Sequence, residues 1–344
     1  MKKLFLIATA LLLVIMVGFW SCEEEKGVTD LPVFKYELKS EIPYDLISKR
    51  EKGFKGTNGS TALLIFPDIK SLTLTMNDLD RQINELDSAF VSFYSNLTTE
   101  ELNDKEVEIN FSSYKPIIDF NNYFLHYSLY QEIATKEEEW LNNETLDNAT
   151  DPDNHFVLEY ALRSVLNTDC EVQIGDSIYK LVENGYYSIP AAKLELLQII
   201  ENKTNISNYP EIRFISNDGV KGDCETGKTK FSFKKVGDYR IKWLVGHHSF
   251  LTFRKVVAKT DNYYKKGNRW KKYRVLCIAQ VYGFISGNGD CSTQLNFNPN
   301  GYFEYDIAKH VEHKIDVQTK TKSGWVKGYF AGANNISHTA TLTW

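Results

Sequence analysis

The 344-residue sequence lacks the short motifs that mark the common classes of enzyme. It contains no G-x-S-x-G, P-loop or G-x-G-x-x-G pattern, so nothing indicates a serine hydrolase or a nucleotide-binding enzyme. C-x-x-C and H-E-x-x-H are also absent, which leaves a zinc ribbon, a thioredoxin-like redox centre and a zinc peptidase without support. We therefore predict no catalytic residue, no metal site and no cofactor.

Long apolar runs are scarce as well. After Trp20 no stretch is long and apolar enough to cross a bilayer, for which a helix needs about 20 residues. The one long apolar run is the 17 uncharged residues from Leu4 to Trp20, which follow two lysines and precede the small Ser21. This order predicts a secretory signal peptide over residues 1–21. An uncleaved membrane helix and cleavage without a lipid are the alternatives.

The signal peptide ends directly before Cys22, and three glutamates follow at residues 23–25. A signal that ends at a cysteine resembles the lipobox of bacterial lipoproteins, in which the thiol is acylated with diacylglycerol. The resemblance implies that Cys22 is lipidated, that residues 22–32 are a tether, and that the membrane is a partner through this anchor. Acidic residues after the cysteine resemble the surface-export signal of Bacteroidota lipoproteins. We expect an outer-membrane lipoprotein at the cell surface, with a periplasm-facing protein as the alternative.

Charge is distributed unevenly along the chain, although the net charge is only −5. Residues 23–227 carry 18 Lys and Arg against 38 Asp and Glu, whereas residues 228–344 carry 20 against 7. This asymmetry, in a chain longer than a single core usually serves, predicts an acidic domain at 33–227 and a basic domain at 228–344. Either the two halves dock on each other, or the basic half offers a face to an external polyanion.

Hydrophobic periodicity predicts different structure in the two halves. In the acidic half, helical spacing predicts helices that begin near Thr75, Ser113 and Asp151, and alternation over 171–189 predicts a β-hairpin. In the basic half, short alternating segments between Gly- and Asn-rich turns are typical of an antiparallel β-sandwich or a barrel-like domain. The predicted fold class is α+β, with a mainly helical N-terminal region that includes a hairpin, followed by an all-β C-terminal domain.

Three short motifs follow Asp151 in the chain: Leu166-Asn167, Glu171-Val172-Gln173-Ile174-Gly175-Asp176 and Ile178-Tyr179-Lys180. Together they resemble a segment that recurs in uncharacterised Bacteroidota lipoproteins, whose families are named only as domains of unknown function. Those proteins often carry glycine at the position of Cys170. The resemblance implies a surface or periplasmic lipoprotein, and it implies no activity and no functional residues.

Four cysteines remain after the signal peptide and Cys22, at Cys170, Cys224, Cys277 and Cys291. An exported protein meets oxidising conditions, where an even number of cysteines favours disulfides. Of the possible pairings we predict Cys277 with Cys291 and Cys170 with Cys224. Free buried thiols are the alternative.

The segment most suggestive of binding is residues 263–274, which hold six positive charges, no negative charge and four aromatic residues around a Gly-Asn turn. As a hairpin, it would place Trp270, Lys272 and Arg274 on one face and Arg269, Lys271 and Tyr273 on the other. Aromatic faces stack on sugars, and cations bind sulfate, carboxylate or phosphate. The alternative is a solvated hairpin whose charges discourage aggregation. The candidate binding residues are Tyr263, Tyr264, Lys265, Lys266, Arg269, Trp270, Lys271, Lys272, Tyr273 and Arg274.

These features favour a non-catalytic surface lipoprotein that binds a glycan, a polyanion or another envelope protein. A structural subunit of an envelope assembly and a carbohydrate-active hydrolase are the alternatives. The pattern His310-Val311-Glu312-His313 does not indicate a metal, because strand alternation sends its two histidines to opposite faces. Nucleic acid does not fit the expected location.

Overall fold

The computed structural model describes residues 34–37, 39–53, 62–143, 148–216, 229–251, 253–287, 293–296, 302–316 and 321–343. The predicted signal peptide, tether and Cys22 lie outside these ranges. The chain groups into two units, residues 1–37 and 38–344, and the second holds all the helices and strands considered below. Within the described ranges, no helix has the length and hydropathy needed to span a membrane.

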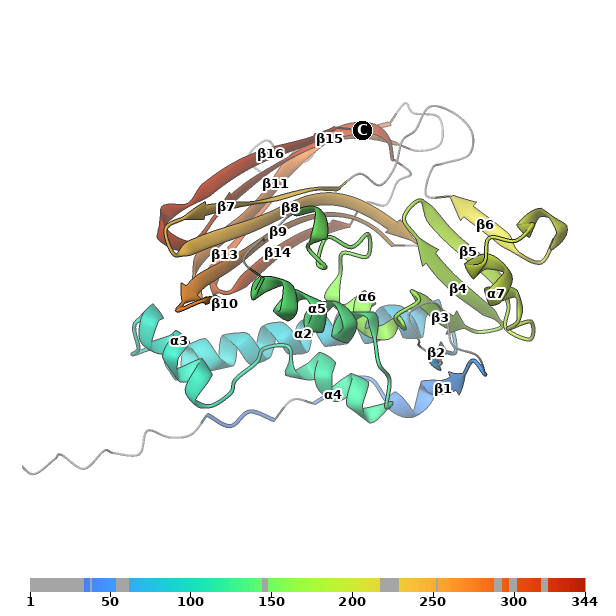
Figure 1. Cartoon of the computed structure of the whole chain (residues 1–344), viewed down its shortest axis with the longest axis horizontal. Helices are drawn as coiled ribbons and strands as arrows, with labels where there is room; N and C mark the ends of the chain where they lie inside the picture. The colour runs from blue at the N-terminus through green and yellow to red at the C-terminus, as the bar shows by residue number, and fades with distance from the viewer. Residues whose placement is uncertain are drawn as a thin grey trace, which may run out of the picture. The chain divides into compact units, whose positions relative to one another are not determined.

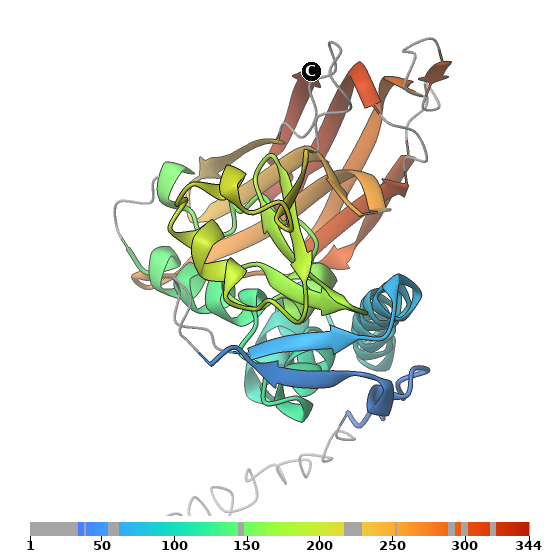
Figure 2. The same cartoon turned by 90° about the vertical axis from the view of Figure 1, so that its right-hand side faces the viewer.

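A mixed sheet belongs to the acidic half. Its six strands lie in chain order, and every neighbouring pair is antiparallel except β2 and β3. Figure 2 shows the two blue strands of this sheet beside its green and yellow ones. The hairpin predicted over 171–189 is confirmed, with its first turn at Gly175. The strands are β1 (Ser48–Glu51), β2 (Ala62–Phe66), β3 (Glu171–Ile174), β4 (Ser177–Val182), β5 (Gly185–Pro190) and β6 (Arg213–Ser216).

Most helices of the acidic half lie between β2 and β3 in the chain. They are α2 (Ile69–Phe93), α3 (Thr99–Glu108), α4 (Lys115–Tyr123), α5 (Leu129–Leu141) and α6 (Tyr160–Val165), and α7 (Leu196–Glu201) follows β5. Short 3-10 turns occur at Tyr44–Leu46, Asn148–Thr150, Ile206–Asn208 and Ala333–Asn335.

The helix boundaries differ from those predicted. Helix α2 begins before Thr75, because the Asp68 carboxylate accepts a hydrogen bond from the Ser71 amide and caps the first turn. The helix predicted to begin near Ser113 is present as α4 but ends at Tyr123, and Ser128 and Gln131 form a capping box that starts a new helix, α5. The helix predicted at Asp151 begins only at Tyr160.

The basic half consists of two antiparallel sheets. One has the strand order β10-β9-β8-β7 with β14 also paired to β9, and the other has the order β12-β11-β15-β16 with β13 also paired to β11. Their strands are β7 (Thr229–Val236), β8 (Tyr239–Phe250), β9 (Phe253–Lys266), β10 (Arg269–Lys272), β11 (Val275–Gly287), β12 (Thr293–Asn296), β13 (Tyr302–Ala308), β14 (His310–Asp316), β15 (Thr321–Ala331) and β16 (Ser337–Thr343).

A shared core joins these sheets face to face. Trp243 of β8 and Val256 of β9 belong to the same buried cluster as Val281 of β11 and Phe330 of β15. The Trp243 and Phe330 rings stack with centroids 5.5 Å apart. The α+β class is therefore confirmed, and of the two forms predicted for the basic half the sandwich is the one present.

Away from the tip of the β9–β10 hairpin, the sheet of β7 to β10 and β14 is covered on both faces. One face meets the second sheet, and the helices α2, α3, α5 and α6 lie along the other (Figure 1). The boundary predicted near residue 228 falls within residues 217–228, outside the described part of the chain. Both halves belong to one compact unit. Of the two uses considered for the charge asymmetry, docking of the halves on each other is the one observed.

Candidate functional site

Strands β9 and β10 form the hairpin predicted from residues 263–274. Lys272 pairs with Tyr263, Lys271 with Tyr264, and the turn contains Gly267 at a φ of 65°, which glycine adopts without steric cost. Strand alternation divides the predicted binding residues between two faces, as expected. In the structure the two faces differ in how far they are buried.

One face of the hairpin is covered by the helices. Tyr263 is fully buried and its hydroxyl donates a 2.8 Å hydrogen bond to Glu137 of α5, while Lys272 lies 3.6 Å from the same carboxylate. Trp270 packs against the end of α5 and is only 8% exposed. The Arg274 guanidinium donates to Asp87 of α2 at 2.7 Å. Tyr263, Trp270, Lys272 and Arg274 are thus engaged in contacts inside the protein.

The other face of the hairpin is open. It carries Tyr264 and Tyr273, which are half-buried, with the exposed Lys266, Arg269 and Lys271. Tyr239 at the start of β8 joins them, because it pairs with Tyr264 across the sheet. The three tyrosine rings form a cluster with centroid separations of 5.0, 5.4 and 6.0 Å.

A second hairpin tip adds charge beside the first. The amide of Lys265 donates a 2.8 Å hydrogen bond to the Asp238 carbonyl, which brings the β7–β8 turn and its exposed Lys234 and Lys235 next to the β9–β10 turn. Acidic groups also lie nearby, since Asp104 of α3 is 3.8 Å from Lys266. We define the basic tip as Lys234, Lys235, Lys265, Lys266, Arg269 and Lys271, and it outnumbers its acidic neighbours Glu100, Asp104 and Asp238.

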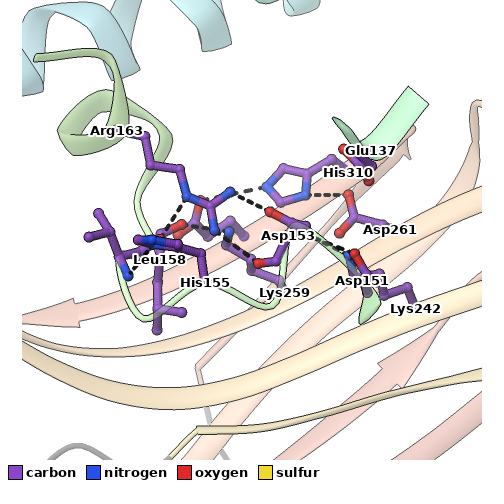
Figure 3. A network of polar contacts seen from close by, with 12 residues as sticks. Glu137, Asp151, Asp153, His155, Leu158, Arg163, Lys242, Lys259, Asp261 and His310 are labelled. Carbon is purple, nitrogen blue, oxygen red and sulfur yellow. Dashed lines mark hydrogen bonds and ion pairs between the residues drawn. The ribbon is translucent and has the colours of Figure 1, made fainter. Parts of the chain in front are cut away.

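A buried charge network lies where the helical layer meets the sheet (Figure 3). Lys242 of β8 lies 2.7 Å from Asp151 and 3.0 Å from Asp153, and Asp153 also pairs with Arg163 of α6. Burial raises the pKa of the Asp153 carboxyl, but Lys242 and Arg163 outweigh it and hold that pKa well below its usual range. Nearby, His310 Nδ1 lies 2.8 Å from Asp261. The network therefore fastens the acidic half to the basic half with opposite charges.

Sequence reasoning missed these interface cations. Arg240, Lys242 and Lys259 are buried on the strand positions opposite the apolar core, where the same alternation would ordinarily indicate solvent. Four aromatic ring centroids lie within 5.3 Å of the guanidinium carbon of Arg240. The rings are those of Trp140, Phe233, Tyr263 and Trp270. The available signal was the pairing of a basic sheet with a strongly acidic helical region in one chain.

A cleft of about 500 Å³ opens between α2 and β14 beside this network. A second cavity of about 430 Å³ adjoins it on the side of α5, and the two share Tyr114, Tyr160 and Lys309. The cleft is also lined by Asp80, Asn84, Asp87, Arg274, His310, Glu312 and Lys314. None of these residues except Arg274 was among the predicted binding residues.

Cys170 and His155 approach each other without forming a catalytic pair. The thiol sulfur lies 3.8 Å from Nε2 of His155, while Nδ1 accepts a hydrogen bond from the Val157 amide. Burial raises the pKa of the Cys170 thiol to about 12 and lowers that of the His155 imidazole to about 3. Both groups are neutral near pH 7, so the pair lacks the thiolate that a cysteine nucleophile needs.

One group of carboxylates has the spacing of a metal site. Oxygens of Asp169, Glu171 and Glu201 lie within 4.8 Å of one another. The Lys52 ammonium group lies between 2.8 and 3.4 Å from all three, and Lys180 lies 2.8 Å from Glu171. Two lysines therefore supply the positive charge that a metal ion would bring.

The predicted covalent modifications stay predictions. Cys170 and Cys277 are buried, but Cys224 and Cys291, assigned as their disulfide partners, lie outside the described residues, as does Cys22. Cys170 adopts a φ of 61°, in the left-handed region that glycine enters most easily. Glycine would therefore adopt the backbone conformation of this position with less strain than cysteine does.

Comparison with known proteins gives one match. No family model matches the sequence, and a search of curated proteins finds no match either. Among solved structures, the chain is similar to a DUF4848 family protein from Bacteroides thetaiotaomicron VPI-5482, with 12% identity and a TM-score of 0.22. The similarity covers 82% of this chain and 97% of that one. That protein belongs to a family of unknown function, and a likeness at this TM-score carries no argument about activity.

Proposed function

We propose that this protein is a non-catalytic binding protein of the cell envelope, which holds an anionic polysaccharide on the open face of the β9–β10 hairpin. The observation that carries the proposal is the cluster of Tyr239, Tyr264 and Tyr273 on the same uncovered face as exposed cations. Sugar rings present C–H groups that pack on aromatic faces, and their sulfate or carboxylate substituents pair with Lys and Arg.

The charge of the basic tip supports a polyanion over a single small anion. The exposed cations Lys266, Arg269 and Lys271 lie on two paired strands, and Lys234 extends the charge of this face onto β7. Because these groups are solvated, each contributes modestly and the sum decides affinity, so binding weakens as salt rises. A chain of repeating anionic units can contact several of them at once.

The proposed location follows from the signal sequence. Cys22 carries the lipid, residues 22–32 tether the body to the outer membrane, and the acidic residues 23–25 favour the cell surface over the periplasm. Intact mass of the membrane-extracted protein tests this part. A chain that begins at Cys22 without added lipid mass contradicts the anchor.

Retention of the purified protein on immobilised heparin and alginate, eluted with a salt gradient, tests the binding site. Neutral dextran is the reference matrix. The triple variant Lys266→Glu, Arg269→Glu, Lys271→Glu should elute at much lower salt than the wild type on both anionic matrices.

The matched control is the triple variant Lys70→Glu, Lys115→Glu, Lys136→Glu. It makes the same change of charge at three exposed positions of the helical layer. It should elute close to the wild type. If the control and the tip variant elute together, retention reflects net charge alone and the proposed site is wrong. A stable protein partner recovered with the wild type from native membranes, with no polysaccharide retained, favours the envelope-assembly alternative.

A further inference from the structure

The cleft between α2 and β14 is a second candidate site, separate from the basic tip. We propose that it binds a neutral saccharide of one or two units. Its volume of about 500 Å³ accommodates a ligand of that size, and its walls come from the helical layer on one side and the sheet on the other.

Polar atoms without partners line this cleft. The Tyr160 hydroxyl, Nε2 of His310 and Oε1 of Glu312 are buried and make no hydrogen bond among the described residues, and the nearest polar atom to His310 Nε2 in an ion pair is the other Glu312 oxygen, at 3.6 Å. A buried polar group left unsatisfied costs about 1–3 kcal/mol, so most such groups in proteins are bonded. Three of them on one cleft provide a set of donors and acceptors that a ligand can complete.

The charged groups around these atoms are already paired. Lys314 lies 2.8 Å from Asp80, His310 lies 2.8 Å from Asp261, and Arg274 is held by α2 and α3. An anion entering the cleft would face the carboxylates, and a cation would face the lysines. A hydroxyl group both donates and accepts, so it fits the mixed lining without leaving a buried charge unpaired.

Aromatic surface completes the site. Tyr114 and Tyr160 meet edge to face, with ring centroids 5.4 Å apart, and Tyr130 lies 5.8 Å from Tyr160 and 6.0 Å from Tyr114, so the three rings form one cluster. Tyr114 and Tyr160 line both the cleft and the adjoining cavity of about 430 Å³. Lys259 and Arg163 already lie over the Tyr160 ring, 4.2 and 5.5 Å from its centroid, so the C–H face of a pyranose would pack on Tyr114. The adjoining cavity has room for a second sugar unit.

The Tyr160 hydroxyl allows a clean test. Since it has no partner among the described residues, Tyr160→Phe removes no hydrogen bond that the fold uses, and the urea midpoint of the variant should match the wild type. A second variant, Asn84→Trp, fills the cleft from an exposed position of α2. The two variants act by different means, so loss of the ligand in both cannot be attributed to one local perturbation.

Binding is measured on the full chain by isothermal titration calorimetry and saturation-transfer NMR. The probes are glucose, galactose, mannose, N-acetylglucosamine, maltose and lactose, with glucuronate and glucosamine as charged counterparts. We expect at least one neutral sugar to bind, Tyr160→Phe to weaken it at least tenfold, and Asn84→Trp to abolish it.

Three results would overturn the inference: no neutral sugar binds, a charged counterpart binds more tightly than its neutral parent, or the bound sugar is indifferent to both variants. Any of these results would mean that the polar atoms of the cleft bind water and not a sugar. Sugar binding tests the cleft, and polysaccharide retention tests the basic tip. Either proposal can therefore fail while the other stands.

Discussion

The ammonium group of Lys242 lies 2.7 Å from the carboxylate of Asp151, and both side chains are almost completely buried. Lys242 belongs to the basic sheet, and Asp151 precedes α6 in the acidic half. Acidic residues of one half of the chain and basic residues of the other are thereby paired inside the protein.

Removing one member of this pair should be costly. Lys242→Ala leaves Asp151 and Asp153 buried without their cation, and we expect a loss of about 3–5 kcal/mol in the free energy of unfolding. Urea denaturation measures it. The control is Lys136→Ala, which breaks an exposed pair with Glu132 on α5 and should cost less than about 1 kcal/mol. Similar losses in the two variants would show that the buried interface pair contributes no more to stability than an exposed pair.

The backbone at Cys170 predicts a difference between two small substitutions. Its φ of 61° suits glycine, whereas alanine retains the Cβ that makes this region unfavourable. Cys170→Gly should therefore be more stable than Cys170→Ala by about 1 kcal/mol, measured by thermal and urea unfolding. Both variants lose the thiol and any disulfide at this position, so their difference isolates the backbone. An alanine variant as stable as the glycine variant contradicts the assignment.

His126 should make stability fall in mild acid. Burial lowers the pKa of its imidazole from 6.5 to about 4, although a hydrogen bond to the Leu166 carbonyl opposes the change. The unfolded chain therefore binds a proton more readily between these values. The stability that neutral His126 contributes is complete above about pH 6.5 and is lost as the pH falls through 4, by about 3 kcal/mol.

Urea unfolding between pH 7 and pH 4 tests this, with His126→Gln as the comparison because glutamine keeps a donor for the carbonyl. The variant should lose less stability than the wild type across the range. His155, whose pKa is also lowered by burial, titrates in both proteins and cancels from the difference. Parallel pH profiles would refute the assigned role of His126.

Gly283 marks a place where two strands leave no room for a side chain. A Cβ there would lie 2.2 Å from the Trp325 carbonyl oxygen and 2.9 Å from Cα of Val326, both backbone atoms of β15. Gly283→Ala should cost about 3 kcal/mol, because the sheet must separate locally. Thr341→Ala, at an exposed position of β16, should change stability by less than about 0.5 kcal/mol in the same assay. A tolerated Gly283→Ala would mean that β11 and β15 are farther apart than described.

Local pattern was enough to predict the α+β class, the 171–189 hairpin and the 263–274 hairpin with its division into faces. Each depends on alternation or turn chemistry within a few residues, which is written in the sequence. The start of α5 was also open to prediction, since Ser128 and Gln131 have the spacing of a capping box. The start of α6 was not, because the residues from Asp151 to Glu159 are held in an irregular path by lysines of β8 and β9.

Only the tertiary structure decided which face of the basic hairpin is open. Alternation places Trp270, Lys272 and Arg274 together, but it cannot tell whether water or protein lies over them. The groups that cover this face are distant in the chain: Glu137 lies 126 residues before Tyr263, and Asp87 lies 187 before Arg274. The sequence thus determined a basic, aromatic hairpin and a chain whose two halves carry opposite net charge. Docking of the helices then determined that half of that hairpin is an internal contact and that Tyr264, Lys266, Arg269, Lys271 and Tyr273 face outward, because burial depends on partners that no local pattern contains.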